Sequence, residues 1–331
     1  MANDSQSEGK SPLERITFHM ISLFVVGLAA VITNTTFLVL LYKIKKRKSF
    51  FFLQGFAWCS LINGLADVGG FLRRIAVILM EVNEMTRREC ITQALNVILF
   101  FVSETGGTVS MFSLCLDRFA SMYRPIHPHS LQTLRNKRIG AALILSSALF
   151  TFILAVTFGT QNPDEPLPPS CYGNDIMGRS FYEIHYMFNS IVGISTVLLY
   201  LITLAIIRKK TKNSVSAVGD IQLRRQVVVT KRLSVVLFST FFLQVVPFML
   251  LNASTWSEFR WKSMVSITVL PRGVAMAVYP IALMLAQPEL NNQAKALLGR
   301  CARKETTDQT NNSLAATAQT TKESTENRFI N

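Results

Sequence analysis

Long apolar stretches recur along the chain, and they constrain its fold more than any other feature of the sequence. A helix of roughly 20 apolar residues crosses the roughly 30 Å hydrocarbon core of a bilayer. Because a helix satisfies its own backbone polar groups inside lipid, the stretches predict an all-α membrane protein built as a seven-transmembrane helix bundle. The spans, of about 20 residues or more each, are predicted at 16–42, 50–79, 90–122, 138–158, 181–207, 232–251 and 263–286.

Basic residues are concentrated in every second connection between these spans. The sequence has 34 Lys and Arg against 20 Asp and Glu. The positive-inside rule places basic connections in the cytoplasm, so the N-terminus is expected outside the cell. Nucleic-acid binding would need the basic groups on one folded face, so no nucleic-acid partner is predicted. The basic clusters lie at 43–48, 124–138, 208–232 and 295–304.

The sequence outside the spans divides into three further segments. Residues 1–15 are polar and are expected to form an extracellular tail. Pro288 favours a helix start within 287–301, which is predicted to be a short amphipathic helix at the membrane interface. Its last residue, Cys301, is a candidate lipidation site. Residues 302–331 are rich in Thr, Ser, Asn and Gln, so they are expected to be a disordered cytoplasmic tail.

An acid–base pair closes the third predicted span. Asp117 and Arg118 follow its last apolar residues, and Pro125 comes seven residues after the arginine. A charged pair at the end of a membrane helix is costly unless it reaches the interface or is paired inside the protein. A snorkelling arginine at the membrane boundary is the alternative to a functional role.

Further polar residues fall inside the first, second and fifth spans. Asn34 is expected to hydrogen-bond a neighbouring helix. Asp67 is either a functional residue or a hydrogen-bond partner of Asn34. Arg73 and Arg74 lie near the outer end of the second span, where at least one of them is expected to snorkel to the interface. Tyr200, near the cytoplasmic end of the fifth span, faces either the bundle interior or the lipid interface.

These residues, taken in order, resemble the motifs of rhodopsin-like (class A) G-protein-coupled receptors. Asp117-Arg118-Phe119 is similar to the Asp-Arg-Tyr sequence that ends the third helix of that family. Pro125 falls where the family keeps a proline in its second cytoplasmic loop. Asn34 and Asp67 resemble the polar residues of the first and second helices, which form an intramembrane network.

The sixth and seventh spans match the same family only in part. Phe241 and Pro247 are kept from its Phe-x-x-Cys-Trp-x-Pro motif, while Gln244-Val245 replaces Cys-Trp. Pro247 is expected to kink its helix, because proline removes a backbone hydrogen bond. Tyr279-Pro280 keeps only the proline of Asn-Pro-x-x-Tyr. Such divergent motifs look most like those of nematode-type serpentine chemoreceptors.

The resemblance implies a plasma-membrane receptor that binds an extracellular ligand and activates a heterotrimeric G protein. Movement of the sixth helix at Pro247 would open the cytoplasmic end of the bundle. Asp117, Arg118, Pro125, Tyr200 and Pro280 would then take part in coupling. Val227 stands near the place of the usual acidic partner of the arginine, which makes constitutive signalling a hypothesis.

The resemblance also implies a disulfide bond between Cys90 and Cys171. Both fall in predicted outside segments, which face an oxidising compartment. Cys90 lies 28 residues before Arg118, about three more than is usual in the family. Three helical residues change the position by roughly 4.5 Å while nearly preserving the helix face, so the bond remains feasible.

Family geometry places a ligand site in the outer half of the bundle. Glu104 lies 14 residues before Arg118, about 21 Å toward the outside. Arg272 lies eight residues before Pro280. Both side chains would border the outside-facing cavity, close enough to pair, and Arg74 is a further candidate ligand contact. The pair is either a structural ion pair or the contact for a polar or anionic ligand.

Three other kinds of protein fit the sequence less well. A secondary transporter, the main alternative, would show an internal repeat with paired broken helices, and the sequence shows no such repeat. A retinal protein needs a lysine in its last span, and none lies between Ser263 and Ala286. An enzyme would need a nucleophile–base or metal-ligand constellation, which is not found, so no catalytic residue, cofactor or metal is predicted.

Overall fold

The computed structural model describes residues 18–43, 51–81, 84–123, 129–212, 238–239, 241–256, 261–286 and 290–296. The expectations for Pro125, Val227, Cys301 and the two tails lie outside the described residues. The chain divides into two compact units, Met1–Leu283 and Met284–Asn331, and each is treated by itself.

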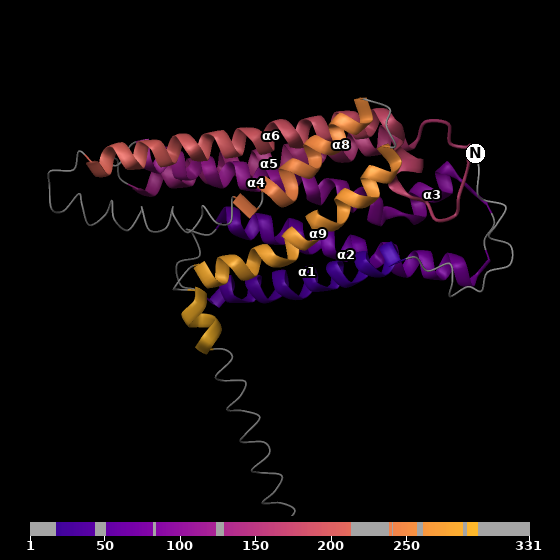
Figure 1. The fold of residues 1–331 in the computed structure, drawn as a ribbon, viewed down its shortest axis with the longest axis horizontal. Helices are drawn as coiled ribbons and strands as arrows, with labels where there is room; N and C mark the ends of the chain where they lie inside the picture. Colours follow the sequence, from indigo (N-terminus) through magenta and orange to yellow (C-terminus); the bar gives the residue numbers. More distant parts are fainter. Residues whose placement is uncertain are drawn as a thin grey trace, which may run out of the picture. The chain divides into compact units, whose positions relative to one another are not determined.

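Seven helical segments form the described bundle of the first unit, and they lie side by side along a common direction (Figure 1). Four of the described helices are long and apolar enough to cross a membrane by themselves, within Met20–Lys43, Leu95–Ala120, Lys137–Gly159 and Asp175–Lys209. The segments are α1 (Phe18–Lys43), α2 (Phe51–Leu79), α4 (Leu95–Tyr123), α5 (His129–Gly159), α6 (Gly173–Lys212), the π-helical turn η4 (Phe241–Val245) with α8 (Val246–Trp256), and α9 (Trp261–Ala286).

The third span, α4, is the central helix of the bundle. It packs against α2, α5 and α6, while α1 packs on α2 and α8 packs on α6. Of its most apolar stretch 78% is buried, against 22% to 33% for the other three membrane-length helices. Small residues allow this close packing: a Cβ at Gly106 would lie 2.9 Å from Cys59 Sγ of α2. The polar residues of α4 therefore face other helices rather than lipid.

A small cap lies at one end of the first unit (Figure 1). It consists of β1 (Met85–Thr86), the short helix α3 (Arg87–Gln93) and β2 (Pro166–Leu167). The strands pair antiparallel, with Met85 opposite Leu167. Cys90 of α3 is bonded to Cys171 across a Cα–Cα distance of 5.6 Å, so the predicted disulfide is confirmed.

The cap changes the predicted start of the third span. The sequence-based span began at Cys90, whereas α3 ends at Gln93 and α4 begins at Leu95. Thr86 starts α3 as its N-cap, because its hydroxyl accepts from the Glu89 backbone N–H at 3.3 Å. Glu89 Oε2 in turn accepts from the Thr86 backbone N–H at 2.8 Å. This reciprocal capping box makes α3 a separate helix outside the membrane-length segment.

Two other helices deviate from regular α geometry. Gly178 has φ 70°, which breaks the first turns of α6 from the rest of that helix. Only glycine adopts this left-handed region at no steric cost. The sixth span contains η4 immediately before Pro247. π-helical turns occur mostly as local bulges within α-helices. The kink expected at Pro247 stays a prediction.

The second unit contains a short described helix, Leu290–Ala296. It lies within the segment 287–301 that the sequence predicts to be an interfacial helix. The boundaries of that segment stay a prediction.

Candidate functional site

A buried ion pair joins α4 to α9. Glu104 and Arg272 are 0% and 1% exposed, and Arg272 Nη1 contacts Glu104 Oε1. The sequence-based expectation that these two side chains pair is therefore confirmed. Removing two charges from water costs several kcal/mol per ion, roughly, so neither residue can lose its partner without a penalty.

His185 on α6 contacts the same carboxylate. Its Nε2 lies 2.9 Å from Glu104 Oε2, and the side chain is buried. The imidazole stacks on the Phe181 ring at a centroid distance of 5.5 Å. Asn189, one turn later on α6, donates from Nδ2 to the His185 carbonyl at 2.9 Å. Glu104 therefore ties α4 to α6 as well as to α9.

Hydroxyl groups extend this network to α5. Asn189 Nδ2 donates to Thr105 Oγ1 at 3.4 Å, and Thr151 Oγ1 of α5 donates to the same atom at 3.1 Å. All of these side chains are buried. Glu104, His185, Asn189 and Arg272 are called the polar cluster below. Together with Thr105 and Thr151, they form a polar layer at which α4, α5, α6 and α9 meet.

The guanidinium of Arg272 is also enclosed by aromatic rings. Its Cζ lies 4.5 Å from the centroid of Phe100 and 5.6 Å from that of Phe248 on α8. A cation over a ring face is attracted by the ring quadrupole, and more strongly when water is excluded. Arg272 therefore contacts the sixth span in addition to α4.

A second polar contact links the sixth span to α4. Gln244 in η4 donates from Nε2 to Thr108 Oγ1 at 3.1 Å. Thr108 lies one turn beyond Glu104, and its hydroxyl donates to the Glu104 carbonyl at 3.1 Å. Val245, the residue after Gln244, packs closely on α6: a Cβ added to Gly193 would lie 2.8 Å from Val245 Cγ2. The residues that replace Cys-Trp thus hold η4 against α4 and α6.

The intramembrane residues Asn34 and Asp67 have different surroundings. Asn34 Nδ2 donates to the Met276 carbonyl of α9 at 3.1 Å, which confirms the expected bond to a neighbouring helix. Asn34 Nδ2 also donates to the Ala30 carbonyl at 2.8 Å, so the described hydrogen bonds of Asn34 do not involve Asp67. Asp67 packs on α1 at Gly27: a Cβ added to Gly27 would lie 2.8 Å from the Cβ of Asp67.

Arg73 and Arg74, near the end of α2 that lies at the cap, contact the loop that follows β2. Arg73 donates to the carbonyl groups of Pro169 and Ser170 at 3.0 and 3.1 Å. The Arg74 guanidinium lies 4.4 Å from the centroid of the Tyr172 ring. Snorkelling was expected of at least one of them, but both have partners in the protein. They hold the loop that carries Cys171.

The residues expected to couple to a G protein lie on several helices, among them α4, α6 and α9. Asp117 and Arg118 are half-buried in the last two turns of α4. Arg118 Nε is buried without a hydrogen-bond partner among the described residues. Tyr200 is 4% exposed, so it faces the bundle interior rather than the lipid interface. Pro280 is buried in α9.

His185 and Asn189 are functional candidates that sequence reasoning missed. They lie four residues apart on α6, so they occupy one helix face. A histidine and an asparagine at this spacing within an apolar segment are a signal of a buried polar face, because isolated polar groups are expensive in lipid. Gln244 was noted only as a substitution in a motif.

Comparison with known protein families assigns the chain. The family model described as serpentine type 7TM GPCR chemoreceptor Srsx matches residues 24–279, which run from α1 to α9. No protein with a curated description matches the sequence. The matched range contains the polar cluster, the disulfide and Asp117-Arg118. This match confirms the resemblance to serpentine chemoreceptors and the interpretation of the chain as a receptor that is not an enzyme. The chain belongs to the Srsx family of serpentine seven-transmembrane G-protein-coupled chemoreceptors.

Proposed function

We propose that this chemoreceptor lies in the plasma membrane with its N-terminus outside, binds a polar or anionic extracellular ligand at Arg272, and activates a heterotrimeric G protein. The family supports a receptor, and the distribution of basic residues supports the orientation. The observation that carries the proposal is the ion pair between Glu104 and Arg272, because it is buried where several helices meet.

The proposed ligand competes with Glu104 for the guanidinium of Arg272. An anionic group can bind a guanidinium through two parallel hydrogen bonds. Glu104 would keep His185 as a partner, since that contact uses its other carboxylate oxygen. The carboxylate therefore need not be left buried and alone when the ligand takes Arg272.

Loss of this pair alters the packing of the sixth span. Arg272 contacts Phe248 on α8. Thr108, one turn after Glu104 on α4, bonds the Glu104 carbonyl and accepts a hydrogen bond from Gln244. A ligand that binds one arrangement of these contacts better than another shifts the population of receptor states. The proposed shift is a movement of the sixth helix at η4 and Pro247, which opens the cytoplasmic end.

The experiment that tests the ligand site compares three receptors at matched surface expression. A library of small carboxylates and other polar metabolites is screened on the unaltered receptor with a promiscuous G-protein reporter. The strongest agonist is then titrated on Arg272→Gln and on Arg179→Gln. Arg179 is the matched control, because it is an arginine of α6 that pairs with Glu183 on the same helix.

Arg272→Gln is expected to reach the surface and to lose at least tenfold in agonist potency, about 1.4 kcal/mol of binding free energy. Arg179→Gln is expected to keep its potency. Unaltered potency in Arg272→Gln contradicts the ligand role. A loss of surface expression that is restored by exchanging the residues, with Arg at 104 and Glu at 272, shows that the pair is only structural.

Arg118 is proposed to contact the G protein in the active state. Arg118→Ala is expected to reduce G-protein activation at least tenfold while leaving surface expression intact, because the side chain lies at the end of α4 and is only half-buried. The measurement is nucleotide exchange on a purified G protein in receptor-containing membranes. Arg88→Ala, at an exposed arginine of α3, is the control. Unchanged exchange by Arg118→Ala would leave a snorkelling arginine as the correct interpretation.

A further inference from the structure

The carboxylate of Glu104 is shared between one permanent cation and one imidazole. Its Oε1 contacts Arg272 Nη1, and its Oε2 lies 2.9 Å from His185 Nε2. All three side chains are buried. An arginine stays protonated in proteins, whereas an imidazole changes its charge near neutral pH. The charge of the polar cluster is therefore set by the protonation state of His185.

The contact between His185 and Glu104 is compatible with either state of the imidazole. A carboxylate only accepts hydrogen bonds, so Nε2 carries a hydrogen and donates it to Glu104. Asn189 Nδ2 lies 3.3 Å from the same nitrogen, but it has acceptors of its own in the His185 carbonyl and Thr105 Oγ1. A second proton can therefore be added at Nδ1 without breaking the bond to Glu104.

The charges around the polar cluster balance while His185 is neutral. Asp67 on α2 interacts electrostatically with Arg272, with Glu104 and with Arg74 of its own helix. The two carboxylates and two guanidiniums of this group sum to zero. A proton on His185 would leave one positive charge in excess, and a buried charge without a counter-charge is costly. We therefore expect His185 to be neutral in this arrangement.

The other ionisable side chains of α6 do not change this balance. Tyr182 and Tyr186 interact electrostatically with the polar cluster, but a tyrosine is ordinarily neutral below about pH 10. Asp175, in the first turn of the helix, interacts with Tyr182. Arg179 and Glu183 pair with each other. None of these residues therefore compensates a charge on the imidazole.

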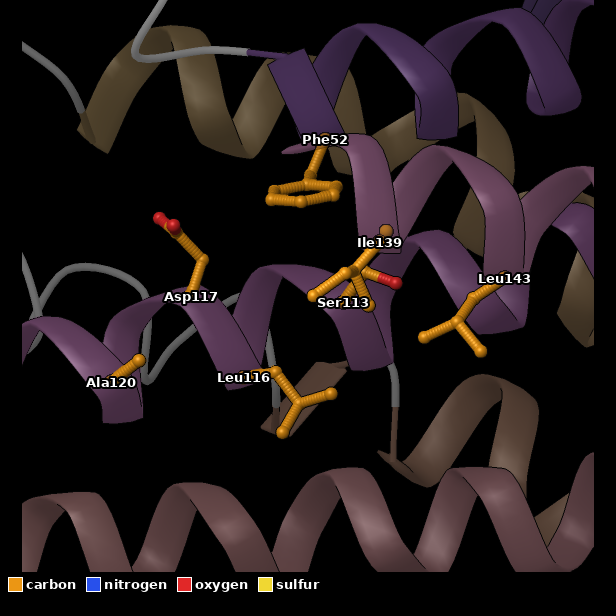
Figure 2. A pocket seen from close by; sticks show the side chains of 8 residues that line it. Phe52, Ser113, Leu116, Asp117, Ala120, Ile139 and Leu143 are labelled. Carbon is orange, nitrogen blue, oxygen red and sulfur yellow. The ribbon is translucent and has the colours of Figure 1, made fainter. Parts of the chain in front are cut away.

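The remaining helices packed against the polar cluster add no charge to it. The next acidic residue of α4 is Asp117, 13 residues after Glu104, which is about 20 Å along the helix. It lies beside a pocket that Phe52 also lines (Figure 2). From α5 and α8 the cluster meets Thr151 and Phe248, which carry no charge.

An anion at Arg272 disturbs the balance of charges. The anion adds one negative charge, while Glu104 and Asp67 keep theirs, so the group carries one negative charge in excess. Carboxyl groups have ordinary pKa values near 4, and the ordinary pKa of histidine lies near neutral pH, so His185 is the residue that takes up a proton most readily. Its Nε2 already contacts Glu104, which stabilises the imidazolium.

We propose that an anion binds at Arg272 together with a proton, which is taken up by His185. The proton comes from the aqueous solution and adds to the lone pair of Nδ1, so no covalent bond is broken. This inference rests on the proposed function, since it needs an anionic ligand at Arg272. The complex holds one more proton than the free receptor, so a fall in pH favours the complex. For a monocarboxylate the affinity is expected to rise by up to about tenfold per pH unit.

The protonation state of His185 is measured by solid-state NMR of the full-length receptor in nanodiscs. Histidine labelled at its ring nitrogens distinguishes imidazole from imidazolium by the nitrogen shifts. The chain has four histidines. His19→Gln, His127→Gln and His129→Gln together give a background in which His185 is the one signal. Each receptor is checked for an unchanged thermal unfolding midpoint.

Removing the charge of Arg272 stands in for an anion that compensates it, so the test needs no ligand. At about pH 7.5 the background receptor is expected to contain the imidazole. Arg272→Gln is expected to raise the ratio of imidazolium to imidazole at least about tenfold, because negative charges then outnumber positive ones. Adding Glu104→Gln should restore the imidazole. Arg179→Gln is the matched control, since Arg179 pairs within α6, and it should leave the ratio unchanged.

Three results would overturn the proposal. An imidazolium in the background receptor leaves no proton to be taken up, and this measurement needs no change at Arg272. An imidazole that persists in Arg272→Gln shows that the proton goes elsewhere. An equal rise of the ratio in Arg179→Gln shows an unspecific change. If Arg272→Gln does not fold, Arg272→Met, whose side chain suits the rings of Phe100 and Phe248, takes its place.

The failure of this inference and the failure of the ligand site give different results. A persistent imidazole, with agonist potency lost in Arg272→Gln, rejects the uptake of a proton and leaves the ligand site in place. Unaltered agonist potency in Arg272→Gln rejects the ligand site and the joint binding with it, whatever the NMR spectra show. Lost potency together with the imidazolium signal supports both.

Discussion

Single side chains decide how the sixth span of this receptor is held. Gln244 occupies a position at which the class A motif has cysteine, and it bonds Thr108 of α4 at 3.1 Å. Both side chains are buried. A buried hydrogen bond between neutral groups contributes about 0.5–1.5 kcal/mol net. Because the bond joins η4 to α4, breaking it should favour any state in which the sixth span has moved.

Gln244→Met is therefore expected to raise basal signalling about twofold to tenfold. Methionine has a similar length but cannot donate, while Thr108 keeps its bond to the Glu104 carbonyl. The measurement is agonist-free reporter activity at matched surface expression. Thr108→Val should have a similar effect, and the double variant should add little to either change. Basal activity equal to that of the unaltered receptor in both single variants contradicts this role.

At the residue scale, sequence reasoning found charged residues better than it found uncharged ones. Glu104, Arg272 and Asp117 could be selected because a charge in a membrane segment needs an explanation. His185 and Asn189 were missed because each fits within an apolar average and belongs to no motif. The carboxylate of Glu104 contacts both Arg272 and His185. This double contact depends on three-dimensional packing, which residue spacing does not specify.

Short elements outside the spans depend on local polar contacts. The capping box of α3 is visible in the sequence as Thr86 followed three residues later by Glu89. The third span was nevertheless predicted to begin at Cys90, within α3, whereas α4 begins at Leu95. A hydropathy average covers many residues, so it does not reveal a helix start that is set by one capping residue. The π turn η4 was likewise not predicted, since proline indicates an irregular helix but not its kind.

The capping box makes the stability of α3 depend on pH. The backbone N–H and hydroxyl of Thr86 donate to Glu89 and hold the pKa of that carboxyl below its ordinary value of 4.5. A lowered pKa means that the carboxylate stabilises the cap fully above pH 4.5 and that this contribution is lost as the pH falls through the lower, folded-state pKa.

Hydrogen–deuterium exchange of 86–93, corrected for intrinsic rates, is expected to accelerate as the pH falls through this range. Glu89→Gln should exchange faster at neutral pH and show a smaller dependence on pH. Glu84→Gln, at an exposed glutamate just before β1, is the control. An identical pH profile for Glu89→Gln and the unaltered receptor would exclude the capping carboxylate as the cause.

The whole first unit is held together by contacts between distant parts of the sequence. The Cys90–Cys171 disulfide closes a loop with a sequence separation of 81 residues. Cross-linking a loop of this length restricts the unfolded chain, and the loss of such a bond typically costs about 2–5 kcal/mol. The fold class could be predicted because hydropathy indicates it. The disulfide could be predicted because the family resemblance implies it and both cysteines fall in segments expected to lie outside. The arrangement of the outer loop could not.

Cys90→Ser is accordingly expected to lower the thermal unfolding midpoint of the purified receptor by several degrees and to reduce its surface expression. Cys171→Ser should do the same, and the double variant should be no worse than either, because one bond is lost in every case. Cys59→Ser, at a half-buried free cysteine, is the control. An unchanged midpoint in both single variants would show that the bond does not stabilise the receptor.

The outer loop has a consequence for the timing of the response. It is held by the disulfide, by Arg73 and by the contact of Arg87 with Glu165 at 2.6 Å. Its apolar residues, Leu167 among them, share a core with the aromatic rings around His185. If a ligand binds Arg272 as proposed, we expect it to pass this tightly held loop on entry and exit, so both its association and its dissociation should be slow. Such a sensor responds to the average of a stimulus over time and gives little account of its rapid fluctuations.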